Sequence, residues 1–198
     1  MIISIHQPQY LPWGGYFDKI DKSDIFVFLD NVQYEKNGWQ NRNKIRTNQG
    51  IKWLTVPVRH KLGQKILDIE INGNKWVKKH INTIEQNYKC KNNSNWKRIK
   101  KVLEKEHKKL LELNCELSKI IANILGFNSI FVKASEIDIN AENPDDRIIE
   151  IVKKLKGEIY IAGAGGKNYM DLDKYPFKVI FQKYSEPEPL SVIDKILL

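Results

Sequence analysis

The sequence predicts an α/β fold built on a largely parallel sheet with a central helical section. Short apolar, β-branched runs alternate along the chain with stretches in which apolar residues recur at helical spacing. With 198 residues, the chain is long enough to bury one hydrophobic core. We therefore expect a single domain over residues 1–198, made of an α/β part (1–74), a helical section (75–126) and a second α/β part with a glycine loop (127–198).

The N-terminal part of the chain gives strand, helix and strand signals in that order. The run "MIISI" predicts a buried strand with His6 at its end, "GYFDKI" has apolar residues at helical spacing, and "IFVFLD" predicts a second strand that ends on Asp30. A polar loop follows, and then "KWLTVPV" predicts a third strand, which Pro57 places at a sheet edge or a strand end. The run "ILDIEI" predicts one more short strand, closed by the turn "NGN".

The rest of the chain begins with the helical section and then returns to strands. Residues 75–125 favour two or three helices, interrupted near "KNNSN" and ended by Gly126. "IFVKASEI" predicts a strand, and "NPDDRIIEIVKKLKG" predicts a helix with acidic residues in its first turn and basic residues in its last. "EIYIAGAGGKNYMD" predicts a strand that runs into a glycine loop, and "FKVIFQKY" predicts the final strand.

Charge and composition argue against several classes of protein. The net charge of +9 is concentrated in the lysine-rich segment Lys78–Leu113, but the apolar residues of this segment form a helical stripe that leaves the lysines on a solvated face. Nucleic-acid binding by a helix over Lys97–Lys109 is therefore the weaker interpretation. Cys90 and Cys115 show neither disulfide nor zinc spacing, so we expect no metal site and a reducing, cytoplasmic location. No apolar run reaches the length of a membrane span.

Three segments combine residues suited to ligand binding. In "HQPQYLPWGGY" a histidine and amides follow the first strand, and in "QYEKNGWQNRNKIR" an arginine stands beside aromatic and amide side chains. In "IAGAGGKNYMD" backbone amides beside glycines can hold an anion. Because ligands of open α/β sheets bind beyond the carboxyl ends of the strands, we expect the segments to converge on one pocket there. The candidate residues are His6, Gln7, Tyr10, Trp13, Asp30, Tyr34, Lys36, Trp39, Asn41, Arg42, Gly163, Gly165, Gly166 and Asp171.

Five blocks of the sequence, in this order, resemble the WbqC-like family. They are "HQPQYLPWGGYFDKI", "DIFVFLDNVQYEKNGWQNRNKI", "WLTVPV", "AGAGGKNYMD" and "LSVID", and they span nearly the whole chain. The family is associated with bacterial surface-polysaccharide (O-antigen-type) gene clusters. The resemblance implies an enzyme that adds an amino-acid-derived acyl group, such as glycyl, to the amino group of a nucleotide-linked sugar. Two features depart from the family pattern: Ala162 stands where a serine is expected, and the segment before "LSVID" is short.

The implied transferase reaction assigns roles to the candidate residues. It needs a base for the sugar ammonium, donors for a developing oxyanion, and cations or amides for a diphosphate. We expect His6 to be the base, and Tyr10, Gln7 or Asn41 to supply the donors. The expected anchors are Arg42, Lys36 and the loop Gly163–Gly166, and the expected stacking surfaces are Trp13 and Trp39. The sequence does not identify the acyl donor, for which ATP with magnesium and a charged acyl carrier are the candidates.

Two other functions stay open. One is the binding of a nucleotide sugar without turnover, within a biosynthetic complex. The other is nucleotidyl or adenylyl transfer, because the succession of strand, proline-containing loop, helix and strand is similar to the start of the Rossmann-like nucleotidylyltransferases that carry an HxGH motif. In this chain Pro12 and Gly15 fall where those histidines would stand, so the HxGH loop is degenerate.

Overall fold

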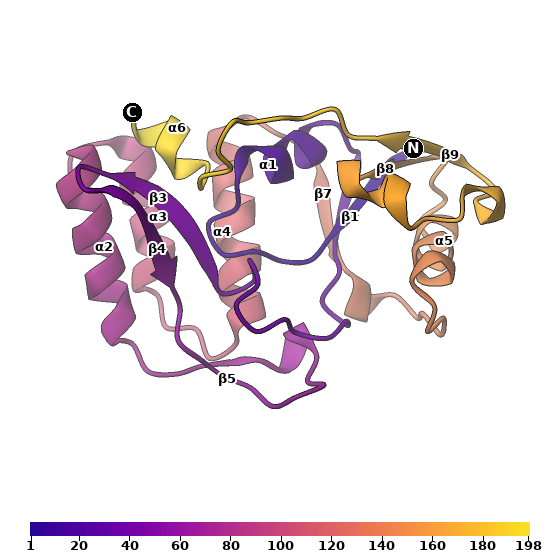
Figure 1. Ribbon diagram of the computed structural model, residues 1–198, viewed down its shortest axis with the longest axis horizontal. Helices are drawn as coiled ribbons and strands as arrows, with labels where there is room; N and C mark the ends of the chain where they lie inside the picture. The colour runs from indigo at the N-terminus through magenta and orange to yellow at the C-terminus, as the bar shows by residue number, and fades with distance from the viewer.

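The fold is organised around one parallel sheet, which lies in the right-hand half of Figure 1. The computed structural model describes all 198 residues, and the sheet has five strands in the spatial order β7-β2-β1-β8-β9. Every neighbouring pair is parallel. The strands are β1 (Ile2–His6), β2 (Ile25–Phe28), β7 (Ile130–Lys133), β8 (Ile159–Ala162) and β9 (Lys178–Phe181). The predicted α/β class with a parallel, Rossmann-like sheet is confirmed.

Helices cover both faces of this sheet, because successive side chains of each strand point to opposite faces. Phe26 and Phe28 of β2 belong to the larger apolar core, which they share with α1 and α4. Ile25 and Val27 point the other way and pack with residues of α5. The bounds of these helices are Gly14–Asp21 for α1, Leu110–Ile124 for α4 and Pro144–Lys154 for α5. The sheet is therefore doubly wound, with α1 and α4 on one face and α5 on the other.

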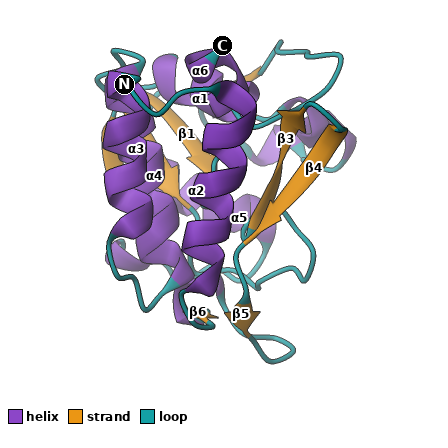
Figure 2. Ribbon diagram, turned by 90° about the vertical axis from the view of Figure 1, so that its left-hand side faces the viewer, coloured by secondary structure: helices purple, strands orange, loops and turns teal.

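A lobe of helices and one hairpin is inserted between β2 and β7, and it fills the left half of Figure 1. Figure 2 shows the hairpin of β3 and β4 on one side of α2, with α3 and α4 on the other. The elements of the lobe are β3 (Arg42–Thr47), β4 (Gly50–Thr55), α2 (Lys75–Tyr88) and α3 (Ser94–Glu104), and the short α6 (Ile193–Leu197) packs onto it. Every helix of the protein is too short or too polar to cross a lipid bilayer.

The predicted helical section is present as three helices, α2, α3 and α4. Asn93 caps α3 by accepting a hydrogen bond from the backbone N–H of Trp96. Gly126 follows α4 with a φ of 81°, a left-handed conformation that favours glycine. The helix expected over Lys97–Lys109 is wrong in its second part, because α3 ends at Glu104 and residues 105–109 connect it to α4.

Two strand predictions in the inserted lobe need correction. The stretch after Asp30 is not only a loop, because residues 42–47 form β3, which pairs antiparallel with β4. The run "ILDIEI" is mostly a 3₁₀ turn over Ile66–Asp68, followed by the two-residue strand β6 (Glu70–Ile71), which pairs with β5 (Val58–Arg59). Helix α6 carries no strong sequence signal, since it is only five residues long.

The C-terminal segment holds the first loop (residues 7–13) in place. The backbone N–H of Val192 donates to the carbonyl oxygen of Pro12 at 2.8 Å. The preceding residue, Ser191, donates its backbone N–H to the carbonyl oxygen of Lys44 in β3, also at 2.8 Å. Tyr184 also packs close to the loop, because a Cβ at Gly14 would lie 2.1 Å from its hydroxyl. A side chain at position 14 would therefore displace the ends of the Tyr184 and Glu186 side chains.

Candidate functional site

The two halves of the sheet meet between β1 and β8. The chain runs from β1 outward to β2 and β7, and it then returns to β8 on the other side of β1. In open α/β sheets such a reversal opens a crevice beyond the carboxyl ends of the two strands, and ligands bind there. The ladder between β1 and β8 ends at Ser4 and Ile161, although β1 continues to His6. His6 and the loop after Ala162 therefore flank this reversal point.

His6 lies at the reversal point with one ring nitrogen free. Its Nδ1 is 3.1 Å from the carbonyl oxygen of Gln7, and because a carbonyl oxygen only accepts, Nδ1 carries the proton. Nε2 has no partner within the protein and keeps its lone pair. The partly exposed ring packs against Tyr16 with 4.9 Å between the ring centroids. Burial, and then the charge of Lys19, lower the pKa of His6 to about 3, so the imidazole is neutral at pH 7.

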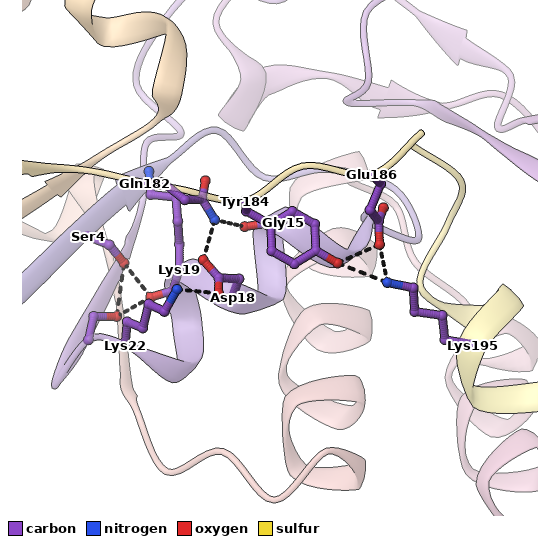
Figure 3. A network of polar contacts seen from close by, with 10 residues as sticks. Ser4, Gly15, Asp18, Lys19, Lys22, Gln182, Tyr184, Glu186 and Lys195 are labelled. Carbon is purple, nitrogen blue, oxygen red and sulfur yellow. Dashed lines mark hydrogen bonds and ion pairs between the residues drawn. The ribbon is translucent and has the colours of Figure 1, made fainter. Parts of the chain in front are cut away.

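Lys19 is a buried amine beside His6. The residue is only 2% exposed, and its Nζ donates to the carbonyl oxygen of Ile5 at 2.7 Å. That carbonyl lies one residue beyond the last pair of the β1–β8 ladder, so the lysine takes the place of the missing strand partner. The neighbouring Asp18 is occupied by Lys22 and by the amide of Gln182 (Figure 3). Burial lowers the pKa of Lys19 to about 7.

The glycine loop lies on the other side of the reversal point. It follows β8 and forms a 3₁₀ turn over Ala164–Asn168. A Cβ added at Gly163 or Gly165 would meet no atom within 4 Å, and the backbone N–H of Gly163 has no acceptor in the protein. Gly166 has a packing role instead, because a Cβ there would lie 2.8 Å from the sulfur of Met170. The first part of the loop thus presents open backbone next to the end of β1.

The first loop and the second polar segment (residues 34–43) lie against each other. Gln40 Nε2 donates to Gln7 Oε1 at 2.6 Å, and the backbone N–H of Tyr10 donates to Trp39 at 3.1 Å. Asn41 is buried, and its amide nitrogen donates to the carbonyl oxygen of Val56 at 2.8 Å. The structure therefore brings these two predicted segments together, with Gln7 at the junction.

Arg42 belongs to an aromatic cluster on the hairpin. Its guanidinium lies 4.3 Å from the centroid of Trp53 and donates to the carbonyl oxygen of Asn37 at 2.5 Å. Trp39 adjoins the same ring, with 5.5 Å between the two centroids. Arg42 and Trp39 thus share a surface with Trp53, whereas His6 contacts α1.

Several other predicted site residues have partners within the protein. Asp30 is fully buried. Its carboxylate accepts two hydrogen bonds from Ser135, one from the backbone N–H at 2.9 Å and one from the side-chain hydroxyl at 2.5 Å. Tyr10 is also fully buried, and its hydroxyl is 2.9 Å from Nδ1 of His80. These contacts give both residues a structural role, so we do not include them in the proposed site. Trp13 packs on Tyr184, Tyr34 packs on His60, and Lys36 and Asp171 are exposed.

The principal cavities lie away from the reversal point. One of them is a groove of about 960 Å³ between α2, α3 and residues 104–108. Lysines and glutamates line much of it, including Glu85 and Lys100, which form an ion pair at 2.9 Å. None of the three principal cavities is lined by His6, Asp30, Arg42 or Gly165, which we expected to share one pocket. Strand order and free polar groups, rather than a deep cavity, therefore mark the candidate site.

A match to one protein family includes the first loop, the hairpin and the glycine loop. Residues 7–191 match the WbqC-like protein family. The chain belongs to this family. The uncharacterized protein Rv1507c of Mycobacterium tuberculosis is 33% identical to this WbqC-like protein over 175 residues, which cover 85% of the chain and 75% of that relative. No solved structure matches the chain.

Lys19 is the buried group beside the candidate site of this WbqC-like protein that the sequence does not reveal. It stands in a short helix between Asp18 and Ile20, near further charged residues at Asp21 and Lys22. A lysine in such a context is normally exposed. Only the packing of α1 against the end of β1 distinguishes it from its neighbours.

Proposed function

We propose that this WbqC-like protein transfers an acyl group, such as glycyl, to the amino group of a nucleotide-linked sugar in surface-polysaccharide biosynthesis. The observation that carries the proposal is the meeting of a free imidazole nitrogen and an open glycine loop at the reversal point between β1 and β8. The imidazole nitrogen can accept a proton, and the loop can hold a phosphate through its backbone amides. Family membership supports the biosynthetic setting.

The diphosphate of the substrate would lie against the glycine loop. The unpaired N–H of Gly163, and the lack of side chains at Gly163 and Gly165, allow phosphate oxygens to approach the backbone. Lys167 is exposed in the same loop and adds a positive charge. On the hairpin, Arg42 and Trp53 form a cationic and aromatic surface that suits a nucleobase or a further charged group.

His6 is the proposed base, and substrate binding would activate it. In the free protein its pKa of about 3 makes it a weak proton acceptor. A diphosphate at the reversal point brings negative charge toward the ring, which favours the imidazolium and raises this pKa. Nε2 then takes a proton from the sugar ammonium, and the amine nitrogen attacks the carbonyl carbon of the acyl donor. The leaving group of the donor departs as the amide bond forms.

Gln7 is the proposed donor to the developing oxyanion. Its Oε1 accepts from Gln40 at 2.6 Å, so the amide nitrogen of Gln7 is left to donate. The activated acyl group would come from an amino acid with ATP and magnesium, or from a charged acyl carrier. Either donor supplies the same carbonyl carbon to the amine.

Mass spectrometry tests the proposal directly. The protein would be incubated with a panel of nucleotide-linked amino sugars and isotopically labelled glycine, with ATP and magnesium in one series and a glycyl-charged carrier in another. We expect a labelled, amide-linked product with the wild type, the same product with Arg98→Ala on α3, and none with His6→Gln. The absence of product with every donor would refute acyl transfer.

The same experiment separates the two alternatives. A noncatalytic binding protein would bind a nucleotide sugar in calorimetry but form no product, and its His6→Ala variant would function normally in the cell. A nucleotidyl or adenylyl transferase would release pyrophosphate from a nucleoside triphosphate in the absence of glycine. Neither result is expected from an acyltransferase that uses a charged carrier.

A further inference from the structure

Four buried side chains between the first loop, α1 and α4 each have one polar atom without a hydrogen-bond partner. The atoms are Gln9 Oε1, Tyr16 OH, Asn114 Oδ1 and Ser118 Oγ, and we call these four residues the α1–α4 polar cluster. Each residue is at most 6% exposed. Buried polar atoms of folded proteins are nearly always paired, because an unpaired one destabilises the fold. A concentration of four in one place therefore requires an explanation.

The four side chains form one cluster that borders His6. The Tyr16 hydroxyl lies beside Ser118 and the backbone of Gln9, but it forms no hydrogen bond of good geometry with either. Ser118 and Asn114 are one turn apart on α4. The ring of Tyr16 packs against the imidazole of His6 with 4.9 Å between the centroids. The cluster thus approaches the proposed base from the side opposite the solvent-exposed loop surface, where α1 covers the sheet.

The cluster is rich in acceptors. Asn114 Nδ2 donates to the carbonyl oxygen of Gln40 at 2.7 Å and to that of Pro8 at 3.4 Å. Because carbonyl oxygens only accept, these bonds fix the orientation of the amide and leave Oδ1 as an unpaired acceptor. Gln9 contributes a second amide oxygen, and the two hydroxyls can accept or donate. Such a set favours a ligand that presents N–H and O–H donors, and it disfavours a phosphate or a carboxylate.

We propose that the α1–α4 polar cluster binds the amino-sugar end of the substrate, its oxygens accepting hydrogen bonds from the sugar's ammonium and hydroxyl groups. This assignment rests on the proposed function, and it places the diphosphate and the sugar on different sides of His6. The ammonium would then lie on the side of the imidazole that packs against Tyr16. Gln9 and Tyr16 belong to the first segment that the sequence marks as suited to ligand binding, whereas Asn114 and Ser118 of α4 lie outside all three segments.

Access to the cluster requires a movement of the first loop, because the four unpaired atoms are inaccessible to solvent in this structure. That loop contains Leu11 with a φ of 42°, a left-handed conformation that is unfavourable for leucine. Residues held in such conformations are concentrated at ligand-binding and switch regions. We therefore infer that the first loop closes over the cluster and moves when a ligand binds.

Two substitutions remove an unpaired hydroxyl without removing any hydrogen bond. Tyr16→Phe and Ser118→Ala should melt at or above the wild-type temperature, because a buried polar group without a partner is lost. Calorimetry then measures the affinity of each variant for UDP-glucosamine and for a dTDP-linked amino sugar. UDP alone and dTDP alone serve as the comparison ligands. We expect affinity for the amino-sugar nucleotide to fall about five- to tenfold, the equivalent of one hydrogen bond, with less than about a twofold change for the nucleoside diphosphate.

Tyr88→Phe is the matched control. The Tyr88 hydroxyl donates to Asp194 at 2.8 Å, so this variant should melt at a lower temperature and bind both ligands as the wild type does. A similar loss of melting temperature in Tyr16→Phe and Ser118→Ala would show that their hydroxyls are paired in solution, for example by buried water, and would overturn the assignment. If the wild type binds the amino-sugar nucleotides and the two variants bind them with the same affinity, the assignment is overturned too. A wild type that binds neither probe would instead refute the proposed function, and with it the sugar site.

Discussion

The Lys19→Met variant should be more stable than the wild type by an amount that depends on pH. Methionine is similar in length and uncharged, so it removes the buried amine together with its hydrogen bond to Ile5. Burial lowers the pKa of Lys19 from 10.5 to about 7, and one pKa unit corresponds to about 1.4 kcal/mol. Below pH 7 the folded protein therefore keeps this ammonium charged at a penalty of about 5 kcal/mol.

The penalty decreases as the pH rises. Between pH 7 and 10.5 the unfolded chain binds a proton that the folded protein has released, so wild-type stability increases with pH in this window. Methionine binds no proton, and the lost hydrogen bond to Ile5 costs the variant about 1–3 kcal/mol at every pH. The net gain of Lys19→Met is then about 2–4 kcal/mol at pH 6 and close to zero at pH 9.

Urea denaturation at several values between pH 6 and pH 9 measures this difference in the free energy of unfolding. In the folded protein His6 stays neutral in this range, because its pKa is about 3, and its titration in the unfolded chain is common to both proteins, so the difference between them reports on Lys19. Lys22→Met is the control on the same helix, since the Lys22 side chain is 49% exposed, and its effect should be small and nearly independent of pH. A constant difference between Lys19→Met and the wild type, or a less stable variant at pH 6, would show that the amine is hydrated or paired.

Three further substitutions test other parts of the site. His6→Gln should melt as the wild type does and lose about 10²–10⁴-fold in turnover, whereas a lower melting temperature with normal specific activity would make His6 structural. Arg42→Ala should weaken nucleotide-sugar binding by about 1.5–3 kcal/mol in calorimetry, and Arg98→Ala should leave it unchanged; equal effects would indicate diffuse attraction by the basic surface. Tyr10→Phe should lower the free energy of unfolding by about 1–2 kcal/mol, because the hydroxyl contacts His80 at 2.9 Å, and turnover should not change. If Tyr10→Phe instead loses turnover while its free energy of unfolding is unchanged, Tyr10 is a catalytic residue.

The inner strands of the parallel sheet were predictable because they are covered on both faces and therefore appear as continuous apolar runs. "IFVF" and "IYIA" coincide with β2 and β8. Strand β3 was not predictable in the same way, because its buried face includes an amide. Asn43 is only 1% exposed and donates to the carbonyl oxygen of Leu11 at 2.7 Å, yet it counts as polar in any hydrophobic pattern.

Only those site residues that lie at strand ends could be predicted from the sequence. His6 and the glycine loop follow apolar runs, so their positions at the carboxyl edge could be inferred, but the adjacency of β1 and β8 depends on tertiary pairing. Polar residues beside a strand end look alike in sequence whether they bind a ligand or a neighbouring backbone. Asp30 illustrates this, because its carboxylate is occupied by Ser135, a residue far away in the chain.

The central position of β1 also matters while the chain is being synthesised. β2 is available to β1 early, since Ile3 pairs with Ile25, but the other neighbour pairs Ile3 with Tyr160 and is made only after the whole inserted lobe. At ordinary translation speeds this interval is on the order of ten seconds. During that time one edge of an apolar strand has no partner and can pair with other nascent chains. A longer insertion between β2 and β7 thus lengthens the time during which β1 has one unpaired edge in the growing polypeptide.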